Sequence, residues 1–226
     1  ARYRGFDGIM IACVDFSEPE VLQLALSDIP VVTIDYIFND RLAVVSDNAK
    51  GMEDLFTYIY QMGHRRIAYI HGTDSAVTTN RLSSFYRTAE KLGVEIPDEY
   101  VMMTRYRDTK GAGEATEKLL DLRRPPTCII YPDDFAAFGG IHVIRERGMS
   151  IPEDISIAGY DGIRLAKLTV PNLTTLCQDT QHLGQYAAEK LIDLIEKPKT
   201  AMRNITIVQG KLYEGQTVLK LDGSRG

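Results

Sequence analysis

The sequence predicts an α/β fold with parallel sheets, because short apolar runs alternate with longer segments of helical period. The apolar runs are nearly continuous, as in strands that helices cover on both faces. Hydrophobic residues make up 44% and charged residues 25% of the 226 residues, which is the balance of a chain with a sizeable core. At about 100–200 residues per domain, this length allows one large domain or two small ones.

The N-terminal segment is expected to contain three strands and one helix. Residues 6–14 are an almost unbroken apolar run, which predicts a buried strand. Ser17 and Glu20 have the spacing of a capping box, which predicts that a helix begins there. Residues 30–35 and 42–46 are the next two apolar runs, and we expect one strand from each.

The clearest helix of the sequence follows these strands. Apolar residues recur there at the spacing of one helical face, and they are Met52, Leu55, Phe56, Ile59 and Tyr60. Gly63 ends this helix, and strands then alternate strictly with helices, which predicts parallel strands. The strands are expected at 66–70, 100–104, 127–131 and 155–160, and the helices at 79–92, at 108–122 and from Asp133 or Asp134 to Arg147.

The pattern changes near the C-terminus. A short helix is expected at 163–168 and a strand at 174–177. A longer helix follows, whose apolar side contains Leu183, Ala187, Leu191 and Leu194. Residues 204–208 and 217–221 are expected to form a pair of β-strands. Because no hydrophilic linker interrupts the sequence, two lobes would have to be joined by strands that cross between them.

Charge and composition exclude several functions. With 26 Lys and Arg against 31 Asp and Glu, the net charge is -5, so nucleic-acid binding by this stretch alone is not expected. No apolar run reaches the about 18 residues of a membrane span, and no secretory signal is expected at the start. Cys13, Cys128 and Cys177 are far apart, which predicts buried, reduced thiols and neither a disulfide framework nor a zinc site.

Motifs of the common enzyme classes do not occur in the sequence. It has no GxxxxGK[ST], HExxH or GxSxG pattern, and we predict no catalytic, cofactor or metal site. His64 follows a helix end, where it is expected to act on the helix dipole and not as a base. Asp133 and Asp134 are either an acid pair or, for one of them, a helix cap. The arginine doublets at 65–66 and 123–124 are expected on solvated surfaces.

Polar and mostly acidic residues follow the strands. Ligands of parallel sheets bind outside the carboxyl ends of the strands, so these positions matter most. Carboxylates accept hydrogen bonds from hydroxyl or amino groups, and arginine donates two parallel ones. The residues are Asp15, Asp35, Asp47, Gly72, Thr73, Asp74, Tyr106, Asp133, Asp134, Asp161, Gln178 and Asp179.

Several short motifs together resemble the lac/gal repressor (LacI/GalR) family of bacterial transcription regulators. They are Val-Ser-Asp-Asn at 45–48 with Gly51, Gly-His-Arg-Arg-Ile-Ala-Tyr-Ile at 63–70, Arg81-Leu82 with Phe85, Pro-Pro-Thr at 125–127, Pro-Asp-Asp at 132–134 with Ala136, Ile-Pro-Glu-Asp-Ile-Ser-Ile-Ala-Gly-Tyr-Asp at 151–161, Leu-Thr-Thr-Leu-Cys-Gln at 173–178, and Leu183-Gly184 with Ala187-Ala188. The matches run from about residue 6 to residue 195. Their order and spacing make the resemblance specific, although no single motif does.

The resemblance implies the effector-binding core of such a repressor, which is similar to type I periplasmic sugar-binding proteins. Such a core has two Rossmann-like lobes joined by three crossing strands, with a small ligand in the cleft. We expect an N-terminal lobe of residues 1–72 and 178–200, and a C-terminal lobe of residues 73–177 and 201–226. The family's helix-turn-helix domain and the first strand-helix-strand of the core are not found in this sequence, so we expect a truncated N-terminal lobe.

The resemblance also implies ligand contacts. Arg81 matches the arginine that grips sugar hydroxyls or a ligand carboxyl or carbonyl group, and Tyr106 matches the aromatic residue that stacks on the ligand ring. Asp161 matches the acid after the Gly-Tyr strand, and Gln178 matches the polar residue on the third crossing. The alternatives are a surface position for Arg81, a core position for Tyr106, a helix cap for Asp161 and a bond to backbone alone for Gln178.

Two further acids belong to the implied site. Asp133 stands where asparagine is common in the family, so the ligand is expected to offer a hydroxyl or amine donor there. Asp47 is expected to cap the helix that begins at Asn48 and to reach the ligand. Because Arg81 and Tyr106 are expected to face the ligand, replacing either should weaken binding without unfolding the domain.

The function implied is that of a cytoplasmic, non-enzymatic sensor. A sugar, sugar phosphate or purine effector would change how a homodimer presents its DNA-reading domains, and operator DNA would be bound only through those domains. The alternative is a periplasmic-type solute-binding protein for a sugar, which would require an export signal. A hydrolase on the same fold is the third class, and no nucleophile–base pair in the sequence supports it.

Overall fold

The computed structural model describes residues 5–12, 23, 29–37, 42–201 and 204–222. The chain divides into unit 1, which is Ala1–Asp47 with Asp179–Gln209, and unit 2, which is Asn48–Gln178 with Gly210–Gly226. The chain therefore passes from one unit to the other three times. The helix predicted to begin at Ser17 lies outside the described residues, as do Cys13 and Asp15.

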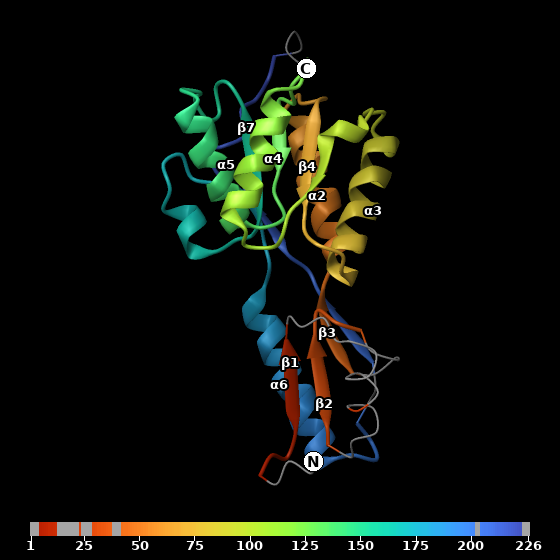
Figure 1. Cartoon of the computed structure of the whole chain (residues 1–226). Coiled ribbons are helices and arrows are strands. Elements are labelled where there is room, and N and C mark those ends of the chain that lie inside the picture. The colour runs from red at the N-terminus through yellow and green to blue at the C-terminus, as the bar shows by residue number, and fades with distance from the viewer. Residues whose placement is uncertain (1–4, 13–22, 24–28, 38–41, 202–203, 223–226) are drawn as a thin grey trace. The chain divides into compact units, whose positions relative to one another are not determined.

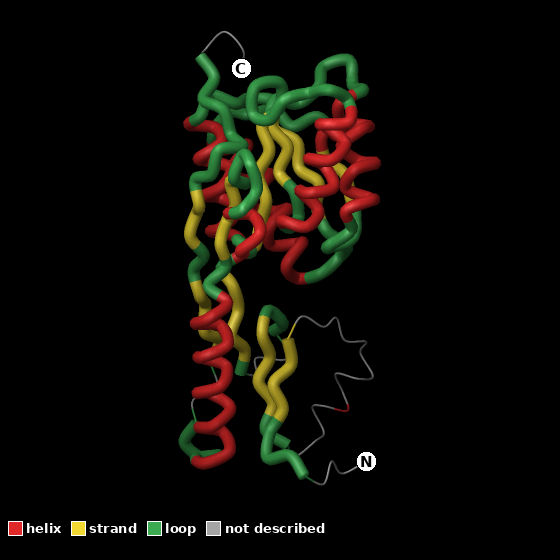
Figure 2. Tube along the Cα trace, turned by 90° about the vertical axis from the view of Figure 1, so that its left-hand side faces the viewer, coloured by secondary structure: helices red, strands yellow, loops and turns green. Residues whose placement is uncertain are grey.

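Unit 2 contains a six-stranded sheet between two layers of helices (Figures 1 and 2). The strands are β4 (Ile67–His71), β5 (Val101–Met103), β6 (Cys128–Ile130), β7 (Ser156–Asp161), β8 (Thr174–Cys177) and β10 (Lys211–Tyr213), in the order β10-β8-β7-β6-β4-β5. All neighbours are parallel except β8 and β10. The helices are α2 (Asn48–Gln61), α3 (Ala76–Lys91), α4 (Thr109–Leu120) and α5 (Asp134–Glu146), with 3₁₀ helices η1 (Asp98–Tyr100) and η2 (Arg164–Lys167).

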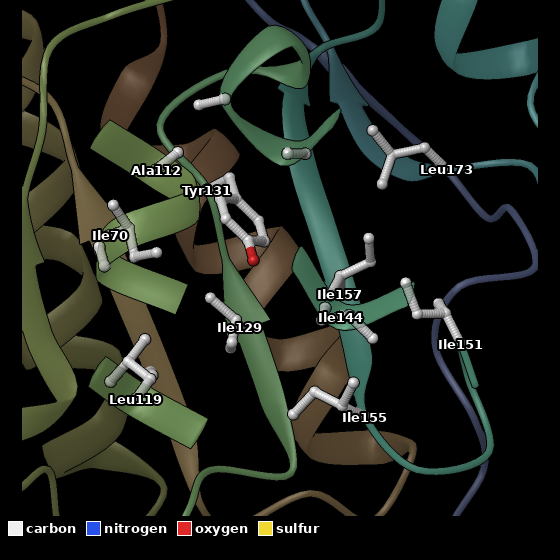
Figure 3. Packing of buried hydrophobic residues seen from close by; sticks show 14 of the residues in the cluster. Ile70, Ala112, Leu119, Ile129, Tyr131, Ile144, Ile151, Ile155, Ile157 and Leu173 are labelled. Atoms are coloured by element: carbon white, nitrogen blue, oxygen red, sulfur yellow. The ribbon is translucent and has the colours of Figure 1, made fainter. Parts of the chain in front are cut away.

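One face of this sheet packs against α4 and α5. Figure 3 shows Ala112 and Leu119 of α4 and Ile144 of α5 gathered around Ile129 of β6 and Ile157 of β7. All five side chains are buried. The alternation of a strand explains why Ile130, next to Ile129, belongs to the core on the opposite face.

The opposite face of the sheet packs against α2 and α3. Met52 and Phe56 of α2 and Phe85 of α3 lie against Tyr69 of β4 and Tyr160 of β7, and all five are fully or almost fully buried. The predicted apolar face of the first long helix is thus confirmed. A sheet covered on both faces is the reason its strands read as continuous apolar runs.

The chain leaves β4 and β6 toward opposite faces of the sheet. Helix α3 follows β4 and belongs to the core with Tyr69, whereas α5 follows β6 and belongs to the core with Ile129. Since β4 and β6 are parallel neighbours, their carboxyl ends form the switch point at which α/β sheets bind ligands. The segments after β4 and β6 therefore border the expected binding place.

Unit 1 contains four described strands and one described long helix. The strands are β1 (Ile9–Ala12), β2 (Val31–Ile34), β3 (Ala43–Ser46) and β9 (Ile205–Val208), which are parallel and lie in this order. Helix α6 (Thr180–Glu196) places Leu183 and Ala187 against Val32 and Val44. In the described part of the chain, no helix is both long and apolar enough to cross a membrane.

The predicted pairing of residues 204–208 with 217–221 is wrong. Strand β9 pairs with β3 of unit 1, and residues 217–221 form no strand. The Thr217 hydroxyl instead forms hydrogen bonds of the kind that a neighbouring strand's backbone would form. Its Oγ1 accepts from the Thr174 N–H at 2.9 Å and donates to the Ile157 carbonyl at 2.8 Å. The strand that closes this side of the unit 2 sheet is β10, which the sequence pattern did not reveal.

The division of the chain differs from the expected lobes. Residues 48–71, which hold α2 and β4, were expected in the N-terminal lobe but lie in unit 2. The reason is packing, because the apolar face of α2 covers the same core as Tyr69, and β4 is hydrogen-bonded between β5 and β6. The third crossing also comes later, after Gln209 and not after residue 200.

Most other elements of unit 2 are confirmed within a few residues at each end. Helix α3 begins three residues earlier than expected, because the Ser75 hydroxyl caps it and accepts from the Thr78 N–H at 3.1 Å. Asp133, and not Asp134, is the N-cap of α5. The short helix expected at 163–168 is the 3₁₀ helix η2, which no side chain caps.

Candidate functional site

Arg81 is the buried centre of a cluster at the switch point of unit 2. Its side chain lies on α3 and is only 2% exposed. Nε donates to Asn48 Oδ1 at 2.8 Å and Nη1 to the Pro132 carbonyl at 2.9 Å. The guanidinium carbon lies 3.5 Å from the centroid of the Tyr160 ring. This geometry excludes the alternative of a surface helix position, and it ties α2, α3 and the end of β6 to one cation.

Asp161 ends β7 beside this cation. Its Oδ1 lies 4.0 Å from Nη2 of Arg81 and accepts a hydrogen bond of 2.6 Å from Nε2 of Gln178. The backbone of Asp161 has φ 103°, a left-handed conformation that side chains rarely adopt. Burial raises the pKa of Asp161 to about 6, and the charge of Arg81 opposes that rise. The side chain remains 32% exposed and is thus the accessible carboxylate of the cluster.

Asp133 uses both of its carboxylate oxygens within the protein. Oδ1 accepts from the Ala136 N–H at 2.8 Å and caps α5, while Oδ2 accepts from the Arg107 N–H at 2.7 Å. The residue is only 1% exposed. Arg107 has the left-handed φ of 59°, so Asp133 holds a strained turn in place. The geometry therefore gives Asp133 a supporting role and offers no accessible oxygen for the ligand contact expected from the sequence.

Asp134 points to a different loop from its neighbour. Its Oδ1 accepts from the Thr175 hydroxyl at 2.6 Å and its Oδ2 from the Ile163 N–H at 2.8 Å. Burial raises the pKa of this carboxyl to about 7, against the effect of these hydrogen bonds. Asp133 thus holds the turn at Arg107, and Asp134 holds the loop at Ile163. The acid-pair interpretation has no geometric support.

Tyr106 lies beside the end of β4. Its hydroxyl is 2.8 Å from Thr78 Oγ1, which itself donates to the Thr73 carbonyl at 2.7 Å. Tyr106 is therefore the donor to Thr78. The Tyr106 ring lies so close to Gly72 that a Cβ at that position would overlap it. Since the side chain is only partly buried, it is held as a wall at the sheet edge and not as part of the core.

The remaining expected acids lie in unit 1. The Asp47 N–H donates to the Val208 carbonyl at 2.8 Å, and a ligand contact by the Asp47 side chain stays a prediction. Asp35, also left-handed at φ 57°, accepts from the Ser46 N–H at 2.6 Å through Oδ1. Asp35 thus links the ends of β2 and β3 within its own unit.

Sequence reasoning missed two members of the Arg81 cluster, Asn48 and Tyr160. Asn48 begins α2 directly after Asp47, and this polar start to an apolar helix was the available signal. Tyr160 was read only as part of a strand, although it precedes Asp161. It lies against Arg81 because β7 runs beneath α3.

His64 has a larger role than the helix-end position predicts. Its ring nitrogens lie 2.9 Å from Thr127 Oγ1 and 2.9 Å from the Leu219 carbonyl, so it joins β6 to the C-terminal segment. Burial lowers the pKa of His64 to about 4. This histidine lies at the amino ends of the strands, opposite Arg81, and is part of the scaffold.

The cluster is suited to holding a small polar molecule. Arg81 supplies donors, Asp161 an acceptor and Tyr106 an aromatic wall, and all three are positioned by the ends of parallel strands. Among the described residues, no group of His, Cys, Asp and Glu side chains could hold a metal ion. Cys128 and Cys177 are free thiols.

Comparison with known proteins identifies similar chains. The model of the periplasmic binding protein-like domain matches residues 56–218. The ribose operon repressor of Haemophilus influenzae is 28% identical over 208 residues, which cover 91% of this chain and 62% of that protein. The HTH-type transcriptional repressor PurR of Salmonella arizonae is 30% identical over 217 residues, which cover 94% of this chain and 63% of that protein. The chain therefore spans about six tenths of the length of these curated relatives.

Solved structures agree with these relatives. A transcriptional regulator of the LacI type from Bacillus cereus subsp. cytotoxis has a TM-score of 0.88 at 25% identity, covering 96% of this chain and 77% of that one. A LacI family transcriptional regulator from Enterococcus faecium with bound ribose has a TM-score of 0.86 at 26% identity. The match covers 97% of this chain and 82% of that one. The predicted fold and the resemblance to the lac/gal repressor family are both confirmed.

Proposed function

This chain belongs to the family of periplasmic binding protein-like domains, and on that premise we propose that it is the effector-binding core of a bacterial transcriptional repressor. The observation that carries the proposal is the pairing of a buried arginine with an accessible carboxylate at the switch point of unit 2. Its relatives are repressors, and a similar structure holds ribose. The effector is a sugar, a sugar phosphate or a purine.

Arg81, Asp161, Gln178 and Tyr106 are the ligand contacts of this proposal, and Asp133 supports them. Arg81 and Asp161 face each other without a direct hydrogen bond, so both retain capacity for a ligand. The Asp133 carboxylate fixes the turn after Tyr106 and thereby orients the aromatic wall. Tyr106→Ala should remove this wall and lower effector affinity by about tenfold.

Effector binding is proposed to shift the equilibrium between two conformations of the protein. A ligand shifts that equilibrium only by its difference in affinity for the two states. Operator DNA is bound by a helix-turn-helix domain of the whole protein, and the protein acts in the cytoplasm, where operator DNA lies. The acidic chain described here should give no sequence-specific band in a gel shift at physiological salt.

We also propose that the core forms a homodimer through an apolar surface on unit 2. This surface comprises Leu165 of η2 and, beyond η2, Leu168 and Val170, which are 49%, 74% and 83% exposed. Arg145 of α5 donates to the Val170 carbonyl at 2.6 Å, so the end of α5 borders this surface. Exposed apolar patches of this kind mark interaction sites. Leu168→Asp should convert a dimer to a monomer in light scattering at tens of micromolar.

The experiment that tests the function is a thermal-shift screen of the full chain against sugars, sugar phosphates and purines. A ligand present at 100 times its Kd should stabilise the protein by about 2.7 kcal/mol. A hit would then be added to the full-length protein in a gel shift with its operator, where it should alter the bound fraction. Binding without any effect on DNA would favour the alternative, a periplasmic-type solute-binding protein.

A further inference from the structure

Two left-handed residues stand side by side where the chain leaves β7. Asp161 has φ 103° and Gly162 has φ 72°. Glycine adopts positive φ about as readily as negative φ, whereas an aspartate held there carries backbone strain. Such strain persists only where the surrounding contacts fix it, and it gathers at functional sites. The turn that carries the Asp161 carboxylate therefore needs contacts that hold its backbone.

Asp134 of α5 supplies those contacts. Its Oδ2 accepts from the Ile163 N–H at 2.8 Å, directly after the turn. Its Oδ1 accepts from the Thr175 hydroxyl at 2.6 Å, and Thr175 Oγ1 in turn accepts from the Gly162 N–H at 3.3 Å. The Asp134 carboxylate therefore holds both of the backbone N–H groups that follow Asp161, one directly and one through a hydroxyl on β8.

The space for the Asp134 carboxylate is built into β7. A Cβ at Gly159 would lie 2.2 Å from Asp134 Oδ1, so the carboxylate reaches the sheet only because this position is glycine. Asp134 is fully buried, and both of its oxygens accept hydrogen bonds. A contribution of Asp134 to effector binding must therefore pass through the residues that it holds.

The contacts of the Asp161 side chain do not hold its backbone. Gln178 Nε2 donates to Asp161 Oδ1 at 2.6 Å, and Arg81 Nη2 lies 4.0 Å from the same oxygen. If Asp161 relaxed to the negative φ that most residues adopt, its side chain would leave the backbone in another direction. The direction of this carboxylate thus depends on the turn, and the turn depends on Asp134.

From this network we infer that Asp134 is a positioning residue of the effector site, because it keeps the Asp161 carboxylate facing Arg81. Asp134 acts by holding the backbone at residues 162–163 and does not touch the effector. The inference rests on the proposed function and deepens it, because it assigns a role in binding to a buried residue that the effector itself does not reach.

A double-mutant cycle tests whether Asp134 acts through Asp161. The affinity of the full chain for D-ribose is measured by calorimetry. Asp134→Ala should lower this affinity about tenfold, because the turn is released. Asp161→Gly removes the carboxylate and accepts the left-handed backbone without strain. In the Asp161→Gly background, Asp134→Ala should change the affinity by less than about twofold.

Asp154→Ala is the matched control for the loss of a carboxylate that holds a backbone group. Asp154 Oδ2 accepts from the Ser150 N–H at 2.7 Å in the exposed turn before β7. This turn leads into the amino end of the strand, whereas Asp161 lies at its carboxyl end. The control variant should therefore bind D-ribose like the wild type.

Thr175→Val and Thr175→Ser separate the hydrogen-bond network from a general loss of folding. Valine keeps the shape of threonine without the hydroxyl, so it breaks the link between Asp134 and Gly162, whereas serine keeps that link. Thr175→Val should lower the affinity about three- to tenfold, and Thr175→Ser should bind within about twofold of the wild type. Hydrogen exchange at Gly162 and Ile163 should be faster in Thr175→Val alone, and this measurement requires no effector.

The outcomes separate this inference from the proposed function. Unchanged affinity in a folded Asp134→Ala variant overturns the inference, and so does a loss that persists in full in the Asp161→Gly background. Unchanged exchange at Gly162 and Ile163 in Thr175→Val overturns it without any effector. If D-ribose does not bind, the compound found in the screen replaces it in the cycle. If no sugar, sugar phosphate or purine stabilises the wild-type chain, the proposed function itself fails, and the inference with it.

Discussion

The described parts of the two units differ in how completely helices cover their sheets. In unit 2, both faces carry cores of large side chains, such as Tyr69, Phe85 and Ile129. In the described part of unit 1, α6 covers one face, and only Leu183 and Ala187 of this helix are buried. The side chain of Ile207 on β9 is 62% exposed. Among the described residues, the largest fully buried side chains and the cluster around Arg81 therefore lie in unit 2.

The position of the site follows from this difference. Arg81 is held by Asn48, Pro132 and Tyr160, which belong to three elements of unit 2. A guanidinium needs such support, because a buried charge is stable only when it is paired and hydrogen-bonded. The well-packed unit 2 thus supplies the rigid contacts that this arginine needs.

Arg81→Ala should have the largest effect on stability. The change leaves the Asn48 and Pro132 oxygens without their donor and removes a cation from beside Asp161. We expect the free energy of unfolding to fall by about 3–5 kcal/mol in urea denaturation. This prediction differs from the expectation that Arg81 can be replaced without loss of fold, because the side chain is buried. The comparable change at exposed Arg147 should be nearly neutral, and a similar loss at both sites would contradict the argument.

The pH dependence of unit 2 should reveal buried carboxyls and a buried histidine that act in opposite senses. Burial raises the pKa of Asp134 from 3.8 to about 7 in the folded state. Between these values the folded protein binds more protons than the unfolded chain, so the Asp134 contribution to stability is complete below pH 3.8 and is lost as the pH rises through 7. With about 1.36 kcal/mol per pKa unit, this loss is about 4 kcal/mol.

His64 acts in the opposite sense. Its pKa falls from 6.5 to about 4 on folding, so the unfolded chain binds more protons between these values, and stability falls as the pH is lowered. The loss is about 3 kcal/mol. Asp161, whose pKa burial raises to about 6, acts in the same sense as Asp134, so the wild-type protein should lose stability as the pH rises from about 4 to 6. Asp134→Asn should flatten this slope, because Asp161 and His64 then oppose each other, and parallel curves for the variant and the wild type would refute the assignment.

Matched truncations in the two cores test the contrast directly. Leu55→Ala removes a fully buried side chain from unit 2 and should cost about 3–5 kcal/mol, whereas Leu183→Ala in unit 1 should cost about 2–3 kcal/mol. Hydrogen exchange should show faster exchange in β2 and β3 for Leu183→Ala, with β6 and β7 unchanged. Equal loosening of both sheets would show that the units unfold together and would break the comparison.

Ile207→Thr should have the smallest effect. The side chain on β9 is mostly exposed, and threonine keeps the β-branched shape that suits a strand. We expect a change within about 0.5 kcal/mol in thermal unfolding. A loss several times larger would mean that another surface covers this side chain in solution, and unit 1 would then be better packed than its described residues suggest.

The local pattern of the sequence predicted most elements of unit 2. The apolar spacing of Met52, Leu55 and Phe56 predicted α2 and its buried face, and short apolar runs predicted β4, β6 and β7. Such patterns are readable because each depends on residues a few positions apart. The prediction for residues 217–221 was wrong because Thr217 bonds to β7 and β8, about 60 and 43 residues away in the sequence.

The candidate site shows the same limit. The resemblance to the lac/gal repressors selected Arg81, Tyr106, Asp161 and Gln178, and the structure gathers Arg81, Asp161 and Gln178 into one cluster. The resemblance could not show that Arg81 is buried or that both carboxylate oxygens of Asp133 already accept hydrogen bonds within the protein. Burial and hydrogen-bond saturation are properties of the assembled neighbours, and those neighbours come from segments far apart along the chain.

The sequence by itself determined the α/β class, most of the strands and helices of unit 2 and the residue types at the strand ends. Periodicity and capping are local, so the chain expresses them without its neighbours. Tertiary structure alone decided that α2 and β4 belong to unit 2, that β9 joins β3, and that Asp133 clamps the Arg107 turn. Each of these depends on which distant surfaces meet, and on which donors remain for a carboxylate after the sheet and helices have formed.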